Sequence, residues 1–396
     1  MIRKIGEICN IFSGGDRPNI FCDCKTDDCN IPVYANAIEE EGLLGFTNKA
    51  KIPEDTITIS ARGSECGAVF YRSVPFYPVI RLLSLIPDTK VIYPKYLYYL
   101  LKTKKIKSFG SGQPQITIPQ ISEMSIEFDE SLEKQKRIAD FLWNIEKSIA
   151  DNNLVIKKCV NICKITYSYW FNQFEFPNDS GAPYKTNKGK MCFNDVLNKD
   201  IPVDWKVQSY AINDLCCFIN PGVDKFIKKQ YLPTANVNGF DFDDGEEISY
   251  ESRESRANMQ PICNSVWFAK MKNSVKHLFI PNNAKWFADK YILSTGFTGL
   301  QCSDISFPYI ASSILQPYFE KKKDILSHGA TQQGVNNDDL ESIILIRPTD
   351  DVLKKYKEAV GGIIEEISLF QRRNQALSRI LTFICPLLLN GQAVLE

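Results

Sequence analysis

Few residues of this chain have the types and spacings that catalysis or metal binding requires. Only two of the 396 residues are histidine, His277 and His328, which excludes HExxH zinc sites and most histidine-based proton relays. Cys22, Cys24 and Cys29 form one metal-like cluster, but their spacing differs from that of a zinc ribbon, and no second pair follows. Ordinary loop cysteines are the favoured interpretation. With no phosphate-binding G-x-x-x-x-G-K-[ST] loop either, the sequence offers no catalytic constellation, and we expect no enzyme activity and no metal site.

A second set of residues has the types that nucleic-acid recognition uses. Four lysines fall in the segment 102–107, at the end of one predicted helix, and Lys321, Lys322 and Lys323 fall near the end of the matching helix. Both runs lead into a loop that contains glycine and glutamine, at 110–116 and at 329–335. Lysine can bind phosphates, and glutamine carries the donor–acceptor pair that matches adenine in the major groove. A solvated helix end is the alternative for each lysine run taken singly.

Other basic and polar residues recur at comparable places in the two halves. Arg62 follows a strand-like run and is matched by Lys270, while the polar turn 13–19 is matched by 220–225. Each is equally well an ordinary turn by itself, so the interpretation depends on the recurrence. The residues predicted to contact DNA are Arg17, Asn19, Arg62, Lys104, Lys105, Gln113, Gln115, Lys225, Lys270, Lys322, Gln332 and Gln333.

The recurrence extends along most of the chain. Residues 5–9 recur as 212–216, residues 32–36 as 233–236, and the glutamine loop recurs 219 residues later. In each half, short strand-like runs such as 56–59 and 68–71 are followed by a helix that begins near a proline, at 94–107 and 308–326. The loop, a last strand and a long helix follow. The chain is therefore predicted to be an internal repeat of two globular parts, with the segment 177–190 as a linker.

The two long helices carry the clearest pattern. Apolar or small residues recur at spacings of four and three from Ile138 to Trp170, and again 218 residues later from Tyr356 to Leu388. Such a pattern over more than four heptads favours a coiled coil, although two helices packed on their own domains are the alternative. An antiparallel pairing would place Asn152 opposite Asn374, and a buried asparagine pair disfavours shifted registers.

Composition and length limit the functions and the domain organisation that the chain can have. The chain has 47 basic and 47 acidic residues, so any binding to a polyanion depends on local patches, and the protein alone is expected to bind DNA weakly. Its length predicts more than one domain. The absence of a leader-like start and of an apolar run of about 20 residues predicts a cytoplasmic protein with free thiols and no membrane association.

This arrangement resembles the specificity (S) subunit of type I restriction–modification systems. The resemblance covers nearly the whole chain and rests on the opening 4–8, the loop 110–116, and the segment 133–139, which is similar to the family's E-Q-K-R-I-A helix entry. The run 170–174 is similar to the end of that helix. The second copy departs from the pattern, because residues 354–357 read K-K-Y-K.

The resemblance implies an α/β (α+β) fold with a pseudo-twofold repeat. Two target recognition domains would be held apart by two conserved helices that form an antiparallel coiled coil. The predicted divisions are a first recognition domain at 1–130, a first helix at 131–174, a linker at 175–203, a second recognition domain at 204–348 and a second helix at 349–392.

The resemblance also implies a function in which the chain itself is not catalytic. Each domain would read one part of a split, asymmetric site in double-stranded DNA. The helices would dock two modification subunits, which methylate adenine with S-adenosylmethionine, and in some systems a restriction (helicase–nuclease) subunit joins them. No cofactor is expected in this chain. The helix residues predicted to contact the partners are Gln135, Arg137, Ile138, Leu142, Ile145, Tyr356, Val360 and Ile363.

Two other functions fit parts of the sequence. A coiled-coil scaffold or dimerisation protein explains the heptads but not two diverged modules with glutamine loops. The specificity subunit of a combined cutting-and-methylating enzyme differs only in its partners, so a neighbouring gene would decide between them. The DNA sequence recognised and the length of its spacer do not follow from the residues.

Overall fold

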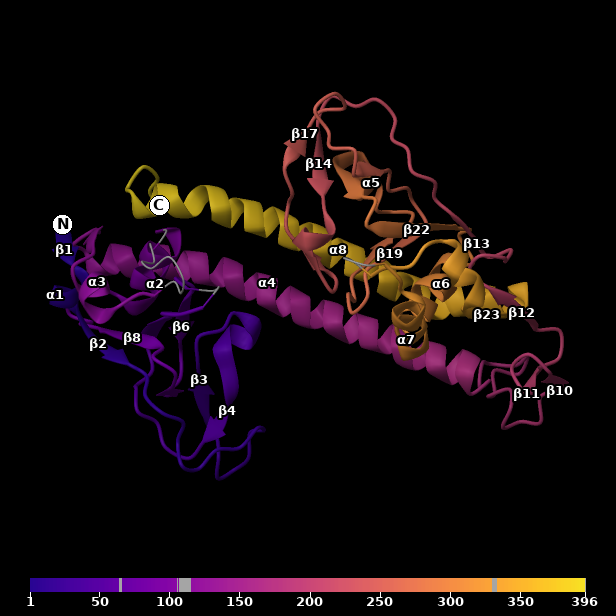
Figure 1. Cartoon of the computed structure of the whole chain (residues 1–396), viewed down its shortest axis with the longest axis horizontal. Coiled ribbons are helices and arrows are strands. Elements are labelled where there is room, and N and C mark those ends of the chain that lie inside the picture. The colour runs from indigo at the N-terminus through magenta and orange to yellow at the C-terminus, as the bar shows by residue number, and fades with distance from the viewer. Residues whose placement is uncertain (64–65, 105, 107–114, 330–332, 396) are drawn as a thin grey trace. The chain divides into compact units, whose positions relative to one another are not determined.

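The structure, a computed structural model, describes residues 1–63, 66–104, 106, 115–329 and 333–395. They fall into two compact units, one made of Met1–Ser148 and Leu377–Glu396 and the other of Ile149–Ala376. Two long helices, α4 (Leu132–Tyr167) and α8 (Asp350–Leu389), contribute to both units (Figure 1). Each unit therefore combines one globular part with one end of each long helix.

In the described residues, the globular part of the first unit contains two larger sheets, a two-stranded sheet and three short α-helices. The elements are β1 (Ile2–Lys4), α1 (Ile5–Ile8), β2 (Cys9–Ser13), β3 (Ile31–Tyr34), β4 (Leu43–Thr47), β5 (Thr56–Ile59), β6 (Val69–Arg72), β7 (Tyr77–Pro78), β8 (Leu83–Pro87), α2 (Pro94–Thr103), α3 (Ile118–Ser122) and β9 (Ser125–Glu127). The main sheet has the antiparallel order β2-β8-β5-β6, and the second has the order β4-β3-β7 with β3 and β7 parallel. Strand β1 pairs with β9.

The globular part of the second unit is larger and also contains two main sheets. Its elements are β10 (Met191–Asn194), β11 (Lys199–Pro202), β12 (Lys206–Ser209), β13 (Cys216–Phe218), β14 (Lys229–Leu232), β15 (Val237–Asn238), β16 (Asp241–Phe242), β17 (Glu247–Ile248), β18 (Ala257–Met259), β19 (Ser265–Ala269), β20 (His277–Ile280), α5 (Lys285–Lys290), β21 (Tyr291–Ser294), β22 (Phe297–Cys302), α6 (Phe307–Ile314), α7 (Pro317–Leu326) and β23 (Ile344–Arg347). One sheet has the order β13-β22-β19-β20 and the other the order β17-β14-β21-β18, with β14 and β21 parallel.

The two units share one topology, which confirms the predicted repeat. The sheet β2-β8-β5-β6 corresponds to β13-β22-β19-β20, the parallel pair β3 and β7 to β14 and β21, and the pair β1 and β9 to β12 and β23. The predicted helix at 308–326 is two helices, α6 and α7, because Pro317 opens a new helix and disfavours helical geometry at Gln316. The repeat thus preserves strand order, whereas its connections differ.

The long helices run antiparallel within the second unit, as predicted. Asn152 Nδ2 donates to Asn374 Oδ1 at 2.7 Å, and Tyr356 Oη lies 3.5 Å from the carbonyl of Cys163, so residue numbers fall along α8 as they rise along α4. In the first unit, Leu142 of α4 shares one core with Leu388 at the end of α8. Heptad periodicity placed the Asn152–Asn374 contact correctly because it fixes which helix face is buried.

This asparagine contact leads to a stability prediction. Asn152 and Asn374 are 6% and 9% exposed, and Asn374 also donates to Asn153. We expect Asn374→Ala to lower the free energy of unfolding by about 1–3 kcal/mol, because it leaves the buried amide of Asn152 without its partner. The double variant Asn152→Leu/Asn374→Leu should recover most of that loss, since both polar groups are gone. Urea unfolding of the three proteins measures this, and a harmless Asn374→Ala would contradict it.

The segment predicted as a linker is packed rather than loose. The ring of Phe176 stacks on Tyr184 at a centroid distance of 4.4 Å and on Trp205 at 5.1 Å, and β10 and β11 form an antiparallel hairpin. Phe176 and Ile201 are buried in the core of the second unit. Proline, glycine and lysine in this segment therefore mark turns, and the aromatic side chains between them attach it to the unit.

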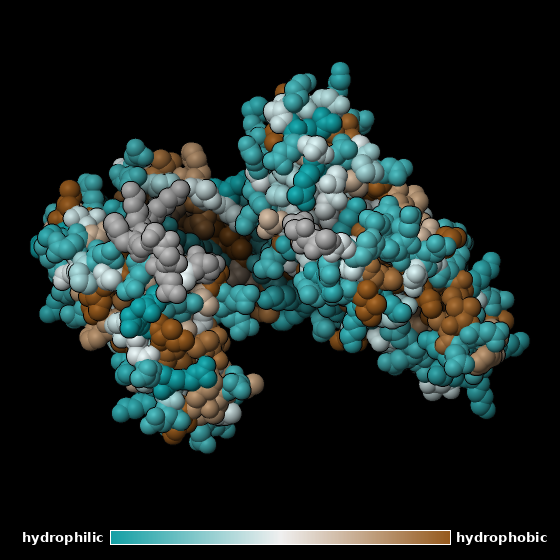
Figure 2. Space-filling view, viewed as in Figure 1, coloured by the Kyte–Doolittle hydropathy of each residue, from teal (hydrophilic) through white to brown (hydrophobic). Residues whose placement is uncertain are grey.

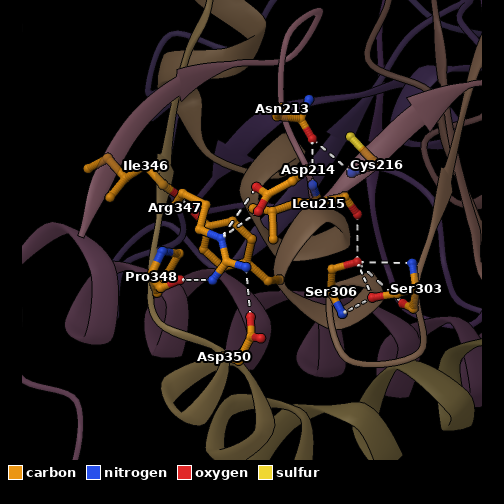
Figure 3. A network of polar contacts seen from close by, with 11 residues as sticks. Asn213, Asp214, Leu215, Cys216, Ser303, Ser306, Ile346, Arg347, Pro348 and Asp350 are labelled. Atoms are coloured by element: carbon orange, nitrogen blue, oxygen red, sulfur yellow. Dashed lines mark hydrogen bonds and ion pairs between the residues drawn. The ribbon is translucent and has the colours of Figure 1, made fainter. Parts of the chain in front are cut away.

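A polar network joins the start of α8 to the sheet region of the second unit (Figure 3). Arg347 Nη2 donates to Asp350 at 2.7 Å, and its Nε donates to Asp214 at 3.2 Å. Burial alone would raise the pKa of Asp214, but a hydrogen bond from Gln208 and the charge of Arg347 hold that pKa below its usual value. The recurring motif at 212–216 is thus structural here. Its first residue also departs from the repeat, because Ile212 is exposed whereas Ile5 is buried.

None of the helices in the described part of the chain is both long and apolar enough to cross a membrane. On the face drawn in Figure 2, hydrophilic residues cover most of the surface, and hydrophobic residues gather in separate patches.

Candidate nucleic-acid interface

In the first unit, two residues predicted to contact DNA lie side by side. Arg62, three residues after β5, forms an isolated backbone bridge with Gln115, which precedes α3. Arg62 Nη2 donates to Gln115 Oε1 at 3.3 Å. Both side chains are half-buried. The strand end and the glutamine loop therefore meet at one place, although 53 residues separate them.

A third basic residue, Arg81, reaches the same place from the turn between β7 and β8. Ile80 and Arg81 have φ angles of 53° and 60°, a region that branched side chains rarely adopt. The turn is braced by Gly14, whose amide donates to Leu82 and whose carbonyl accepts from Arg81. A Cβ on Gly14 would lie 2.8 Å from the Pro78 carbonyl carbon, so only glycine permits this approach.

Asn36 connects this turn to the strand end. Its side-chain amide donates to the carbonyl of Ile80 at 2.5 Å, and its side-chain oxygen accepts from the amide of Ala61 at 2.8 Å. The two arginine-bearing segments are thus held to one asparagine. Strain at a well-braced turn is typical of functional sites, because the surrounding contacts must over-determine it.

The arginines and the glutamine line a shallow pocket of about 330 Å³. Among the residues that the structure describes, the lining contains two arginines and no carboxylate, and it consists of Ser13, Ala61, Arg62, Arg81, Leu83, Gln115, Ile116, Thr117, Ile118 and Pro119. This concentration of positive charge suits a phosphate or the acceptor edge of a base.

The other predicted contacts of the first unit lie outside this pocket lining. Arg17 and Asn19 are exposed, and the Arg17 guanidinium lies 4.5 Å from the centroid of the Phe21 ring. Lys104 is exposed, and its Nζ donates to the Ser125 carbonyl at 3.3 Å. Lys105 and Gln113 lie outside the described residues, as does Gln332 of the second unit.

In the second unit a lysine contacts a glutamine of the corresponding loop, one residue away from the positions equivalent to Arg62 and Gln115, which are Met271 and Gly334. Lys272 Nζ donates to Gln333 Oε1 at 2.9 Å, and the amide of Lys272 donates to the Gln333 carbonyl at 3.0 Å. Gln333 is exposed. Both units therefore place a glutamine against a cation at corresponding loops.

The backbone register corrects one predicted match. The amide of Ile116 donates to the carbonyl of Ala61, and the corresponding amide of Val335 donates to that of Lys270. Lys270 therefore corresponds to Ala61, and Arg62 corresponds to Met271. Lys270 is half-buried, and burial lowers its pKa. The match of Arg62 with Lys270 is wrong by one residue because similar residue types were aligned without the strand register.

The lysine run at 321–323 divides between surface and interior. Lys322 is half-buried, and Lys225, elsewhere in the unit, is exposed. Lys323 is 0% exposed and contacts Glu320 Oε2 at 2.6 Å, and Glu320 Oε1 lies 2.8 Å from His277 Nε2. Lys323 is therefore part of the unit's interior rather than of a phosphate-binding run.

The side chains predicted to meet partners are mostly buried in the cores that the long helices share with the globular parts. Gln135 is buried, and its side chain accepts from Tyr93 and donates to Val91 and Asp129. The residues Leu142, Ile145, Tyr356 and Val360 are buried, and Ile138 and Ile363 are half-buried. Only Arg137 is exposed, with Nη2 donating to the Leu395 carbonyl at 2.9 Å. Most of the predicted contact positions are therefore covered by other parts of this chain.

Two residues of the interface were missed by the sequence reasoning. Arg81 stands alone in an apolar run and Lys272 in a polar turn, and no spacing links either to a glutamine loop. No group of three or more histidine, cysteine, aspartate or glutamate side chains within the described ranges could hold a metal ion. Only tertiary proximity shows the two missed cations.

Comparison with known proteins gives consistent matches. Residues 1–160 match the family model described as the type I restriction modification DNA specificity domain. A Mycoplasma pneumoniae protein named as a type I specificity subunit is 32% identical over 170 residues, 43% of this chain and 50% of that protein. Another, named as the C-terminus of such a subunit, is 31% identical over 127 residues, 32% of this chain and 86% of its own length.

Two further matches cover almost the whole chain. The specificity subunit of a type I restriction enzyme from Methanocaldococcus jannaschii is 23% identical over 381 residues, 92% of this chain and 82% of that protein. The crystal structure of the type I restriction–modification S subunit from M. genitalium matches with a TM-score of 0.61 at 13% identity, covering 98% of this chain and 96% of that one, which shows a shared fold. The chain spans about half the length of the first curated relatives it matches, 50% and 43%.

Proposed function

Because this chain belongs to the type I restriction–modification specificity subunits, which are DNA-recognition subunits, we propose that it directs a modification complex to a two-part site in double-stranded DNA. Each unit reads one part of the site. The observation that carries this proposal is the pairing of a cation with a glutamine at corresponding loops of two units that share one topology, Arg62 with Gln115 and Lys272 with Gln333.

The difference between the units supports an asymmetric site. The first unit has Arg62 and Arg81 at its pocket, whereas Met271 corresponds to Arg62 in the second unit and supplies no charge. Arginine offers a planar fork that can grip guanine with two hydrogen bonds, and lysine offers a point charge. Because the two units carry different side chains at these equivalent positions, we expect them to prefer different bases.

The long helices dock the modification subunits through their exposed faces. Ile162 and Ile165 of α4, in the second unit, are 46% and 61% exposed. The residues 218 positions later, Ile380 and Phe383 of α8 in the first unit, are 47% and 71% exposed. The offset is the one that relates the buried heptads, so each unit carries an equivalent apolar surface. Two copies of one partner fit this repetition.

In this proposal, the partner subunits and not this chain carry out the chemical reactions. The modification subunits bind S-adenosylmethionine and methylate adenine, and a restriction subunit joins the complex where its gene is present. The chain itself supplies recognition and spacing, which agrees with a sequence that carries no catalytic motif.

The proposal is tested by mapping methylated adenines in the source genome with and without this gene. We expect one methylated motif to disappear with the gene, and we expect that motif to have two unlike parts separated by an unspecified spacer. An unchanged methylation map, or a single uninterrupted palindrome, would contradict the two-reader function.

A matched pair of substitutions assigns the parts to the units. Gln115→Ala should relax one part of the motif and Gln333→Ala the other, with each lost base contact reducing discrimination by about 1–3 kcal/mol. Sequencing of methylated sites for each variant of the assembled complex measures this. If both variants degrade both parts equally, the units do not read separately.

A further inference from the structure

The orientation of the Gln115 amide is fixed by its partner. The Arg62 guanidinium can only donate hydrogen bonds, so the atom of Gln115 that faces it at 3.3 Å must be the side-chain oxygen. The backbone bridge between the two residues holds both side chains on neighbouring segments. The glutamine therefore meets a ligand with its oxygen already engaged.

Because its side-chain oxygen is engaged by Arg62, Gln115 can offer a ligand only hydrogen-bond donors. The Gln115 amide nitrogen keeps two N–H groups, and no described residue of the chain accepts a hydrogen bond from it. A guanidinium has five N–H donors, and Gln115 occupies one of those of Arg62. Arg81 adds donors to the same pocket, and none of its lining residues in the described ranges is a carboxylate. The pocket is thus matched to an acceptor-rich ligand.

We propose that Arg62 and Gln115 form a donor-only surface that reads the O6 and N7 edge of a guanine in the part of the site contacted by the first unit. Guanine presents two acceptors in the major groove, whereas adenine and cytosine present amino groups that would face the Gln115 amide donor to donor. Thymine offers one acceptor beside its methyl group. The match of glutamine with adenine, which needs both amide atoms free, does not fit this geometry. The inference rests on the proposed function.

The second unit provides an internal comparison. Gln333 has its oxygen engaged by Lys272 at 2.9 Å, so it also offers donors only. Its partner is a lysine, which lacks the planar fork of arginine and discriminates bases less sharply. We therefore expect the guanine preference to be strong in the first unit's part of the motif and weaker at the position that Gln333 reads in the second unit's part.

Reversing the polarity of the amide tests the proposal. Gln115→Glu keeps the shape of the side chain but replaces the N–H donors with an acceptor. In the assembled methyltransferase complex, preference at one position of one part of the motif should move from guanine toward adenine or cytosine, with guanine discrimination falling roughly ten- to hundredfold. Gln333→Glu is the matched control and should leave that position unchanged. Unchanged guanine preference in Gln115→Glu, or no guanine in the wild-type part, would overturn the proposal.

Modified DNA separates a guanine edge from a backbone phosphate as the acceptor. In binding assays with the wild-type complex, 7-deazaguanine at the assigned position should weaken binding about tenfold or more, and Gln115→Ala should lose most of this sensitivity. Methylphosphonates at the flanking linkages should have equal effects on wild type and variant. Sensitivity of the Gln115 variants to phosphate replacement alone would assign the pocket to the backbone and overturn base reading. If the wild-type complex methylates no motif, the proposed function fails instead.

Discussion

Glu320→Ala is expected to lower the free energy of unfolding of the second unit by about 3–5 kcal/mol, because it leaves a buried ammonium without its carboxylate. Lys323 is 0% exposed, contacts Glu320 at 2.6 Å and otherwise donates to the carbonyls of Ala269 and Ser274. His277, also buried, loses its partner at 2.8 Å in the same variant. Hydrogen exchange of peptides from β19, β20 and α7, together with urea unfolding, measures the loss.

Two further variants distinguish two possible causes of the stability loss in Glu320→Ala, namely an unpaired buried charge and lost packing. Glu320→Leu/Lys323→Met should recover most of the stability, since replacing both members of a buried pair with apolar residues is often neutral. Glu341→Ala, which removes an exposed glutamate of the same unit, should change the free energy of unfolding by no more than about 0.5 kcal/mol. A Glu320→Ala protein as stable as the wild type would show that Lys323 finds solvent in the folded chain.

The same cluster gives the second unit a pH dependence. Burial is the main cause that lowers the pKa of His277, while Glu320 raises it in part. The unfolded chain takes up a proton at His277 near pH 6.5, and the folded chain does so only at lower pH, so stability falls as pH drops below about 6.5. Burial alone would raise the pKa of Glu320, but His277 and Lys323 hold it below its usual value. Stability is therefore lost further as pH falls through that lowered pKa.

The second large effect is expected from placing a charge on the exposed apolar residues of the long helices. Phe383→Glu is expected to remove one modification subunit from the complex and Ile165→Glu the other, because a charge would have to be buried against an apolar partner. Loss of a central apolar anchor typically costs about 2 kcal/mol or more, at least a thirtyfold weaker site. Native mass spectrometry of the co-expressed complex should change from two partner copies to one in each variant, and to none in the double variant.

Neighbouring polar positions provide the controls for docking. Thr382→Glu on α8 and Asn161→Glu on α4 place the same charge beside each apolar surface, at exposed residues one position away from Phe383 and Ile162. Both should retain two partner copies. If Phe383→Glu and Ile165→Glu also retain two copies, the modification subunits dock elsewhere; loss of both copies in one single variant would exclude two independent sites.

The sequence determined the features that depend on local periodicity and repetition. The heptads placed the two long helices close to their observed bounds and set Asn152 opposite Asn374, because spacing along a helix fixes which face is buried. The strand at 56–59 was predicted with its observed bounds, and the repeat was recovered because both units keep one strand order.

Tertiary structure alone decided which side chains meet and which atoms remain free. The pocket joins Arg62, Arg81 and Gln115 from three separate segments, and no local pattern records that closeness. Strand register, set by pairing between distant strands, matched Arg62 to Met271 rather than to Lys270, since a shift of one residue turns a side chain to the other face. Lys323 resembles its solvated neighbours in sequence, yet packing buries it, because a helix position becomes surface or interior only when another element covers it.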